Sequence, residues 1–380
     1  MLLANKLHIT MRQFKIILFF SVIGDSILIM PFITGTLANE DAWISSLLAP
    51  VGGLALGSLY AWIASRQAGQ SLVGCAIAIG GKWIGGLLGL VHIFFFYIVI
   101  LTLLSEISQF MTTQLMVGTP SEAIILAFLI VITAALRYGV ESFVRVSELL
   151  YPVYLFIFVA LFICLVPHIN LNNMLPFLGN GFAPPIKGAY PAFAYGFLEG
   201  VVLLMLIPHV DQDRKALGRA IRSAFLMGSL IILVVVSLCI FVLGADMMKH
   251  KYFSTFYLAQ LVEIGGFLQR MEAALAFLWI ITVFFKALLF SYSATKGLSE
   301  VFRLSNDRIM VMPFMLLLLA GTHINMPNIA EYHYILAIFP NYDVVSCLLL
   351  PFAQSLLLGL PAVKKRLSAG SGQNAGPGGT

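Results

Sequence analysis

The stretch "GDSILIMP", residues 24–31, lies in the middle of the first strongly apolar segment of the chain. It combines an acid with a glycine and a proline, although the residues around it are those of an ordinary membrane helix. A charged side chain inside a span costs at least ~2.5–3.5 kcal/mol, and backbone groups freed by glycine or proline are tolerated at membrane depth only where protein or water satisfies them. The stretch therefore predicts a helix that is broken near Asp25 and faces the interior of the protein or water.

The composition places the whole chain in a membrane. Of its 380 residues, 60% are hydrophobic and only 10% are charged, whereas a soluble domain has about 25% charged residues. The apolar runs are too long and too uniform for barrel strands, so we expect an all-α integral membrane protein with ten transmembrane helices. The ten runs are residues 14–37, 42–63, 84–110, 122–138, 149–166, 189–208, 224–244, 272–294, 309–322 and 343–362.

Lysine and arginine are divided unequally between the two sides that these spans define. The side with both termini holds 17 of the 22, the other side holds four, and Lys286 lies inside a span. Because cytoplasmic loops carry the excess of these residues, both termini are expected in the cytoplasm. We expect one transmembrane domain over residues 1–366, a disordered glycine-rich tail over residues 367–380, and a short surface helix within the loop 245–270.

The sixth apolar run is interrupted in the same way as the first. Gly196 and Gly200 flank Glu199, and each interrupted run opens a set of five, over residues 14–166 and 189–362. Because five is odd, the two sets cross the membrane in opposite directions, which predicts a 5+5 inverted repeat of the LeuT type with interrupted helices 1 and 6 and a site at mid-membrane. The simpler alternative is that glycine and proline are common in membrane helices.

Four ionisable side chains lie well within the predicted spans: Asp25, Glu106, Glu199 and Lys286. Each is either a structural polar contact between helices or part of a functional pathway. Lys286 lies too deep for easy snorkelling and needs an acidic or carbonyl partner, for which Asp25 and Glu199 have the matching depth. We assign Glu199, Lys286 and Glu106 to charge coupling, although Glu106 lies near the outer end of its span.

Half-helices that meet at a break aim amide groups and carbonyl groups at the site. The amide ends suit a carboxylate and the carbonyl ends suit an ammonium group or a cation, so a zwitterionic amino acid matches both, as do other small polar solutes. We place Tyr97 and Tyr195 near such a ligand.

The sequence offers no sign of an enzyme. It contains no nucleotide-binding loop, zincin motif or nucleophile elbow, and "GGKWIGG" at 80–86 lacks the spacing of a phosphate loop. Its four cysteines lie in or beside apolar segments and are interpreted as small apolar residues. We therefore expect no cofactor, no metal and no nucleic-acid partner.

Four longer stretches give the chain a family resemblance. It resembles the spore germination permeases, which are the B subunits of GerA-type germinant receptors and belong to the amino acid–polyamine–organocation transporter superfamily. Gly24 and Pro31 match the first-helix motif of that superfamily, and Ser26 replaces its second glycine. The stretches are "GDSILIMP" at 24–31, "RYGVESFVRVSELLYP" at 137–152, "AYGFLEGVVLLMLIP" at 194–208 and "FLWIITVFFKALLFSYSATKGLSEVF" at 277–302.

The resemblance implies a germinant receptor subunit in the spore inner membrane, acting with an A subunit and a lipoprotein C subunit. Lys286 would act as the lysine that replaces a coupling sodium ion in some relatives. The implied ligand shell is Gly24, Asp25, Ser26 and Ile27 from the first helix, Tyr195, Gly196 and Phe197 from the sixth, and Tyr97 and Phe285 from spans three and eight.

Two further functions agree with the same broken helices. The first alternative is a proton-coupled amino acid transporter, in which Glu199, Asp25 or Lys286 titrates during the cycle. The second is an ion or water pathway through the bundle. The residues alone do not separate these alternatives from a receptor.

Overall fold

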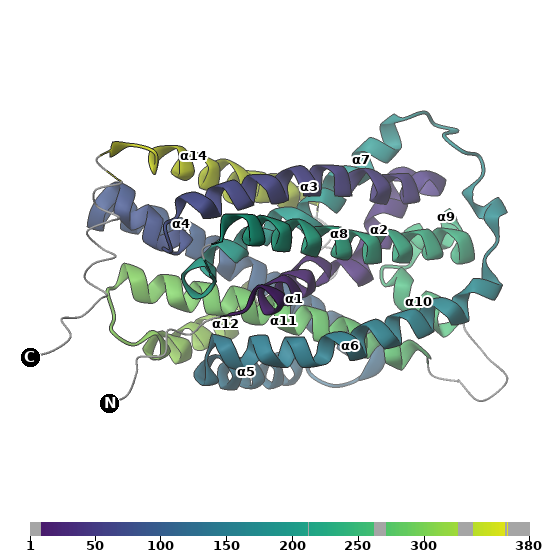
Figure 1. Ribbon diagram of the computed structural model, residues 1–380. Helices are drawn as coiled ribbons and strands as arrows, with labels where there is room; N and C mark the ends of the chain where they lie inside the picture. Colours follow the sequence, from purple (N-terminus) through teal and green to yellow (C-terminus); the bar gives the residue numbers. More distant parts are fainter. Residues whose placement is uncertain (1–8, 212, 262–270, 326–336, 362, 364–380) are drawn as a thin grey trace, which may run out of the picture.

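The computed structural model describes residues 9–211, 213–261, 271–325, 337–361 and 363. Helices make up almost all of these residues, and the only strand-like pairing among them is an isolated parallel bridge between Ile9 and Val210. Most of the helices run side by side along one long axis (Figure 1).

The first predicted span consists of two helices. Helix α1, Met11–Ile23, begins at a capping box in which Thr10 and Gln13 satisfy each other's backbone amides. It ends at Gly24, and helix α2 continues from Ser26–Ala38 with Pro31 inside it. The short η1, Asn39–Asp41, connects α2 directly to α3, Ala42–Arg66.

The remaining helices follow the predicted order. Two of them bend or end at glycines with positive φ, at Gly81 (φ 68°) inside α4 and at Gly139 (φ 98°) between α5 and α6, where only glycine avoids a steric penalty. They are α4 Leu72–Phe110, η2 Met111–Leu115, α5 Ser121–Tyr138, α6 Val140–Leu165, η3 Val166–His168, η4 Leu171–Met174, α7 Ala183–Phe197, η5 Leu198–Met205, η6 Ile207–His209, α8 Arg214–Leu238, η7 Cys239–Leu243, α9 Ala245–His250, α10 Ser254–Gln260, α11 Met271–Val301, η8 Asp307–Met310, α12 Val311–Asn325, a helix over 337–343, η9 Val344–Leu349 and α14 Leu350–Leu357.

Seven helical stretches of the described chain are long and apolar enough to cross a membrane. One of them, Ser26–Arg66, joins the second half of the predicted first span to the predicted second span. The predicted ninth span, which contains α12, and the tenth, which contains η9 and α14, are not among these seven stretches of the described chain.

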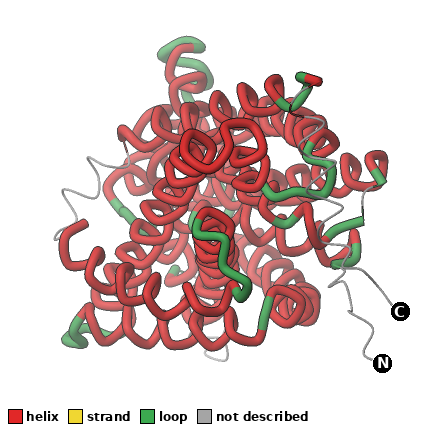
Figure 2. Tube along the Cα trace, turned by 90° about the vertical axis from the view of Figure 1, so that its left-hand side faces the viewer, coloured by secondary structure: helices red, strands yellow, loops and turns green. Residues whose placement is uncertain are grey.

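The bundle is organised around α1. Residues 16–23 of this helix are all buried, so it is apolar on nearly every side, and it lies in the middle of the bundle (Figure 1). The view turned by 90° shows the helices packed around one another (Figure 2). The outer helix α6 instead exposes Leu149 (72%) and Phe156 (75%), as expected of a surface that faces lipid. The protein is therefore an integral membrane protein with a buried central helix.

The prediction of a short surface helix within the loop 245–270 is wrong, because the second helix that forms there is buried. Two short helices, α9 and α10, form there, and α10 packs inward against α2 and α11 with Thr255 and Phe256 buried. The remainder of that loop, residues 262–270, and the predicted disordered tail lie outside the described residues.

Candidate functional site

The break in the first span leaves the carbonyl of Gly24 without its usual helical donor. The amide of Leu28, which would donate to it in a continuous helix, donates instead to the carbonyl of Asp25 at 3.1 Å. The hydroxyl of Thr282, on α11, donates to the Gly24 carbonyl at 2.7 Å. A side chain of the protein therefore satisfies the backbone at the break.

Pro31 frees a second carbonyl one turn later. Proline has no amide hydrogen, so the carbonyl of Ile27, four residues before it, lacks an intrahelical donor. The hydroxyl of Thr255 on α10 donates to this oxygen at 2.7 Å. The inward position of α10 thus follows from the proline in the "GDSILIMP" stretch.

The sixth span changes winding where the sequence predicts an interruption. Helix α7 passes into η5, a 3₁₀ helix of eight residues, although such runs seldom exceed three or four residues and mark hinges or strain. The hydroxyl of Tyr60 on α3 lies 2.7 Å from the carbonyl oxygen of Leu198, at the junction of α7 and η5. The span is tightened here and does not unwind.

The glycine at 200 in this span serves close packing. A Cβ atom on Gly200 would lie 2.8 Å from Cζ of Phe225 on α8, so only glycine admits the ring. Gly196 differs, because a Cβ atom there would meet only Cδ1 of Ile232, at 3.7 Å.

A buried ion-pair cluster joins the two breaks. The Nζ atom of Lys286, on α11, lies 2.6 Å from Oδ1 of Asp25 and 2.5 Å from Oε2 of Glu199. The Lys286 side chain is fully buried, and the two carboxylates are 8% and 4% exposed. Both acids that the sequence proposes as partners are therefore in contact with Lys286, one at each break.

Lys286 reaches Asp25 by passing directly over Gly24. A Cβ atom at position 24 would lie only 2.3 Å from Cδ of Lys286 and 3.3 Å from its Cγ. The first glycine of "GDSILIMP" thus clears the path of the lysine side chain and does more than weaken the helix.

A third acid near the cluster, Asp343, is not among the site residues that the sequence predicts. It ends the helix 337–343 and precedes the π-helical η9, and it is fully buried. Neither of its carboxylate oxygens has a hydrogen-bond partner among the described residues. It interacts electrostatically with Glu199, Lys286 and Asp25. The sequence shows Asp343 only as an acid at the edge of the tenth apolar run, a position typical of residues at the membrane surface.

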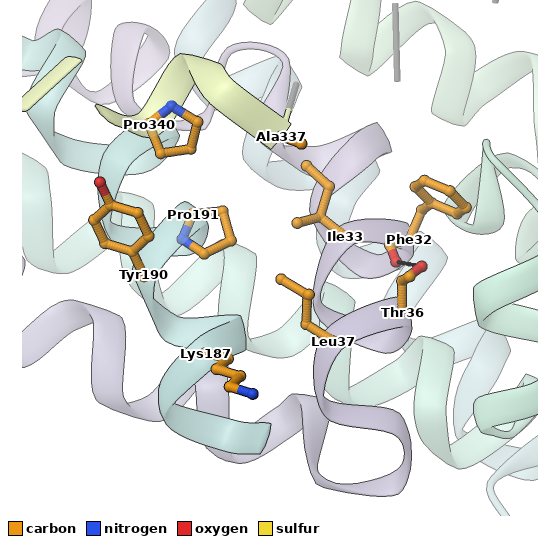
Figure 3. A pocket seen from close by; sticks show the side chains of 9 residues that line it. All are labelled: Phe32, Ile33, Thr36, Leu37, Lys187, Tyr190, Pro191, Ala337 and Pro340. Atoms are coloured by element: carbon orange, nitrogen blue, oxygen red, sulfur yellow. Dashed lines mark hydrogen bonds between the residues drawn. The ribbon is translucent and has the colours of Figure 1, made fainter. Parts of the chain in front are cut away.

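A cavity of about 400 Å³ opens between α2, α7 and the helix 337–343 (Figure 3). We call it the Lys187 cavity. Lys187 and Leu37 lie at one end of it, and Pro340 and Ala337 lie at the other. Its lining residues are Phe32, Ile33, Thr36, Leu37, Lys187, Tyr190, Pro191, Ala337 and Pro340.

A small void of about 10 Å³ extends the Lys187 cavity toward the cluster. Ile33 borders both spaces, and Asp25, Ser26 and Tyr195 line the void. The Tyr195 ring stacks on Phe339 with ring centroids 6.1 Å apart. Tyr195 and its stacking partner therefore stand between the cavity and the buried acids.

A second cavity, of about 380 Å³, lies at the opposite end of the sixth span. His209, which ends η6, and Tyr292 of α11 line it, and Nε2 of His209 lies 2.7 Å from the Tyr292 hydroxyl. Lys296 and Asp307 form an ion pair of 2.7 Å in its wall. We call this space the His209 cavity.

The structure brings some of the predicted ligand residues together and not others. Asp25, Ser26 and Tyr195 line the void, and Gly24 and Ile27 lie beside them. Four other residues of the predicted site pack elsewhere. Phe285 stacks on Phe20, Phe197 packs on α3 and α8, Gly196 faces α8, and Tyr97 donates to the Leu317 carbonyl of α12. Glu106 is buried in α4, and no ion pair to Lys286 is found for it within the described chain.

Comparisons of the sequence find relatives over most of its length. The model of a family described as "Spore germination protein" matches residues 8–328. Spore germination protein KB of Bacillus subtilis (strain 168) is 28% identical over 331 residues, which are 86% of this chain and 88% of that protein. Spore germination protein A2 of the same organism is 25% identical over 350 residues, covering 92% of this chain and 94% of that one.

Two solved structures share the fold. Mhp1, a nucleobase-cation-symport-1 family transporter in a closed conformation with bromovinylhydantoin bound, has a TM-score of 0.63 at 13% identity and covers 96% of this chain and 94% of its own. MhsT in complex with L-phenylalanine has a TM-score of 0.67 at 12% identity, and the match covers 94% of this chain and 91% of the MhsT chain. These likenesses establish the all-α, LeuT-type architecture that the sequence predicts.

Proposed function

The chain belongs to the family of spore germination proteins, and from this premise we propose that it is the B subunit of a germinant receptor in the spore inner membrane. It binds a small germinant, an amino acid in our first hypothesis, and signals through a change of conformation. The observation that carries this proposal is the buried ion-pair cluster that joins both helix breaks beneath the Lys187 cavity.

The cavity suits such a ligand in size and position. Its volume of about 400 Å³ lies within the range of small-molecule sites, and its inner end approaches Asp25 through Ile33 and Tyr195. A ligand there would touch α2 and α7, the two helices that follow and precede the breaks. Binding that favours one arrangement of these helices shifts the population of conformations.

The receptor role requires partners, which we propose to be the A and C subunits of the receptor. A neighbouring subunit would respond to the change in the bundle. In this arrangement both termini lie on the cytoplasmic side, and the Lys187 cavity opens toward the opposite side. The chain performs no chemical reaction in this proposal.

Ligand binding is tested by blocking the cavity. Ile33→Trp adds an indole where the cavity meets the void, and we expect it to abolish the stabilisation that amino acids, sugars or nucleosides give the purified chain in lipid nanodiscs. A ligand stabilises in proportion to RT ln(1 + [L]/Kd), so millimolar affinity is detectable at high ligand concentration. The matched control is Val51→Trp, on a 69% exposed position of α3.

The outcome separates a cavity ligand from a ligand bound elsewhere. Retained stabilisation in Ile33→Trp contradicts the assignment of the Lys187 cavity. If none of the three ligand classes stabilises the wild-type chain, the proposal that this subunit itself binds the germinant is wrong.

The second candidate function is a proton-coupled amino acid transporter. The observation that favours it is the pair of cavities of similar volume at opposite ends of the sixth span. Uptake of labelled amino acids into liposomes, with and without a pH gradient, decides between the two. Concentrative uptake by this chain alone contradicts a function as receptor only.

A further inference from the structure

We propose that Asp343 is the residue that recognises a positively charged amino group of the ligand. This inference rests on the proposed function, because it assigns a chemical class to the ligand of the Lys187 cavity. Among the described residues, Asp343 is the buried acid of the cluster that has neither an ion-pair partner nor a hydrogen-bond donor.

The position of Asp343 follows from the helix that carries it. Pro340 lies at the end of the Lys187 cavity opposite Lys187, as Figure 3 shows, and Asp343 is three residues later on the same helical face. Farther along, the carbonyl of Cys347 lies 3.0 Å from the Tyr60 hydroxyl that also contacts Leu198, at the sixth-span break. Asp343 is therefore placed between the Pro340 end of the cavity and the level of the break.

The charges of the cluster do not balance. Asp25, Glu199 and Asp343 provide three carboxylates, and Lys286 provides the one ammonium group that contacts any of them within the described chain. That ammonium already contacts Asp25 and Glu199. A buried carboxylate without a partner is strongly destabilising in its charged form, so a cation beside Asp343 would stabilise that charged form.

A ligand amino group is the cation that the surroundings favour. Asp343 lies one helical turn after Pro340, which lines the Lys187 cavity; this cavity is mostly apolar, with Lys187 at its far end. A zwitterion oriented with its ammonium group toward Asp343 would place its carboxylate toward Lys187. The stacked rings of Tyr195 and Phe339 join α7 to the helix 337–343, so we expect amine binding beside Asp343 to shift α7.

The experiment uses the full chain in nanodiscs and follows its thermal unfolding with a matched series of probes. The series consists of the natural L-amino acids, the corresponding acids without the amino group, and the corresponding amines without the carboxylate. We expect every stabilising probe to carry an amino group. Asp343→Asn should weaken the binding of these probes about tenfold or more, as expected for the loss of a buried charged hydrogen bond.

Two variants frame the result. Asp246→Asn removes an acid that is 89% exposed and paired with Lys249, and we expect it to bind as the wild type does. Asp343→Glu retains the charge and should keep the preference for amines. If Asp343→Asn does not fold, the probe series on the wild type and on Asp343→Glu still decides the question.

Several outcomes overturn the inference. Equal stabilisation by probes that lack the amino group shows that no amine is recognised, and the absence of any amine-bearing stabiliser has the same meaning. If sugars or nucleosides stabilise the chain while amines do not, the proposed receptor function stands and this inference falls. Stabilisation by sodium or potassium chloride that Asp343→Asn abolishes would identify a site for a metal cation and overturn the assignment to an amine.

Discussion

At the scale of single residues, Gly24 and Gly196 show how two similar positions acquire different roles. The sequence places both at helix interruptions, and a Cβ atom would meet quite different surroundings at each. At Gly24 it would lie 2.3 Å from Cδ of Lys286, whose ammonium group is fixed between two carboxylates. At Gly196 it would lie 3.7 Å from Ile232, an ordinary van der Waals contact.

We expect Gly24→Ala to destabilise the protein by about 1–3 kcal/mol, as other insertions into a packed core do. The added methyl group displaces the Lys286 side chain and lengthens its contact with Asp25. Gly196→Ala is the matched control and should be neutral or slightly stabilising, because alanine is the better helix former. Chemical or thermal unfolding in detergent measures both variants. Equal unfolding midpoints for the two variants would contradict the role assigned to Gly24.

At the scale of helices, the cluster connects three elements that are distant in the sequence. Lys286 belongs to α11, Asp25 lies between α1 and α2, and Glu199 lies in η5. A movement of the backbone at either break therefore changes the contacts of Lys286, which both breaks share. This arrangement gives a physical route by which one half of the bundle responds to the other.

We expect Lys286→Met to destabilise the protein by about 3–5 kcal/mol, because it leaves two buried carboxylates without a counter-charge. Germinant response and assembly with partner subunits should decline with it. Adding Asp25→Asn and Glu199→Gln to this variant removes the uncompensated charges and should recover much of the stability, since a fully neutral replacement of a buried ion pair is often tolerated. Unfolding midpoints of the single and triple variants test this. A single variant that unfolds like the wild type would show that the ion pairs do not stabilise the fold.

The sequence predicted the breaks and the partners of Lys286 but not the surroundings that complete them. Composition and the position of glycine, proline and acids along the apolar runs determine which spans are interrupted, and depth alone matches Lys286 to Asp25 and Glu199. The hydrogen bond from Thr255 is a tertiary contact made by the short helix α10, and no periodicity in the sequence indicates it. The sequence does not predict a buried Asp343, because the edges of spans are uncertain by several residues. A carboxylate at such an edge cannot be distinguished by sequence from one that is exposed to water.

At the scale of the whole molecule, the two cavities and the cluster form a line through the bundle. The Lys187 cavity is lined by the C-terminal part of α2 and the N-terminal part of α7, and the His209 cavity lies where the sixth span ends. The charged cluster lies at the breaks of these same two spans. The exterior is apolar where α6 faces outward, so we expect a solute to approach the cluster from the ends of the bundle.

We therefore expect cysteines in the two cavities to react from opposite sides of the membrane. In a Cys164→Ala background, whose three remaining cysteines are buried, Leu37→Cys should react with a membrane-impermeant maleimide from the side away from the termini. Ser305→Cys, in the wall of the His209 cavity, should react only from the side of the termini. Phe156→Cys, on the lipid-facing surface of α6, is the unreactive control.

The same labelling reports on the proposed ligand. A germinant bound in the Lys187 cavity covers position 37, so saturating ligand should slow the modification of Leu37→Cys. If ligand binding also closes the opposite end by moving the helices around the cluster, the rate of maleimide modification of Ser305→Cys should change although the ligand does not contact position 305. Labelling of both positions from one side would contradict the arrangement of the cavities. A ligand effect at Leu37→Cys with none at Ser305→Cys would show that binding is not transmitted through the cluster.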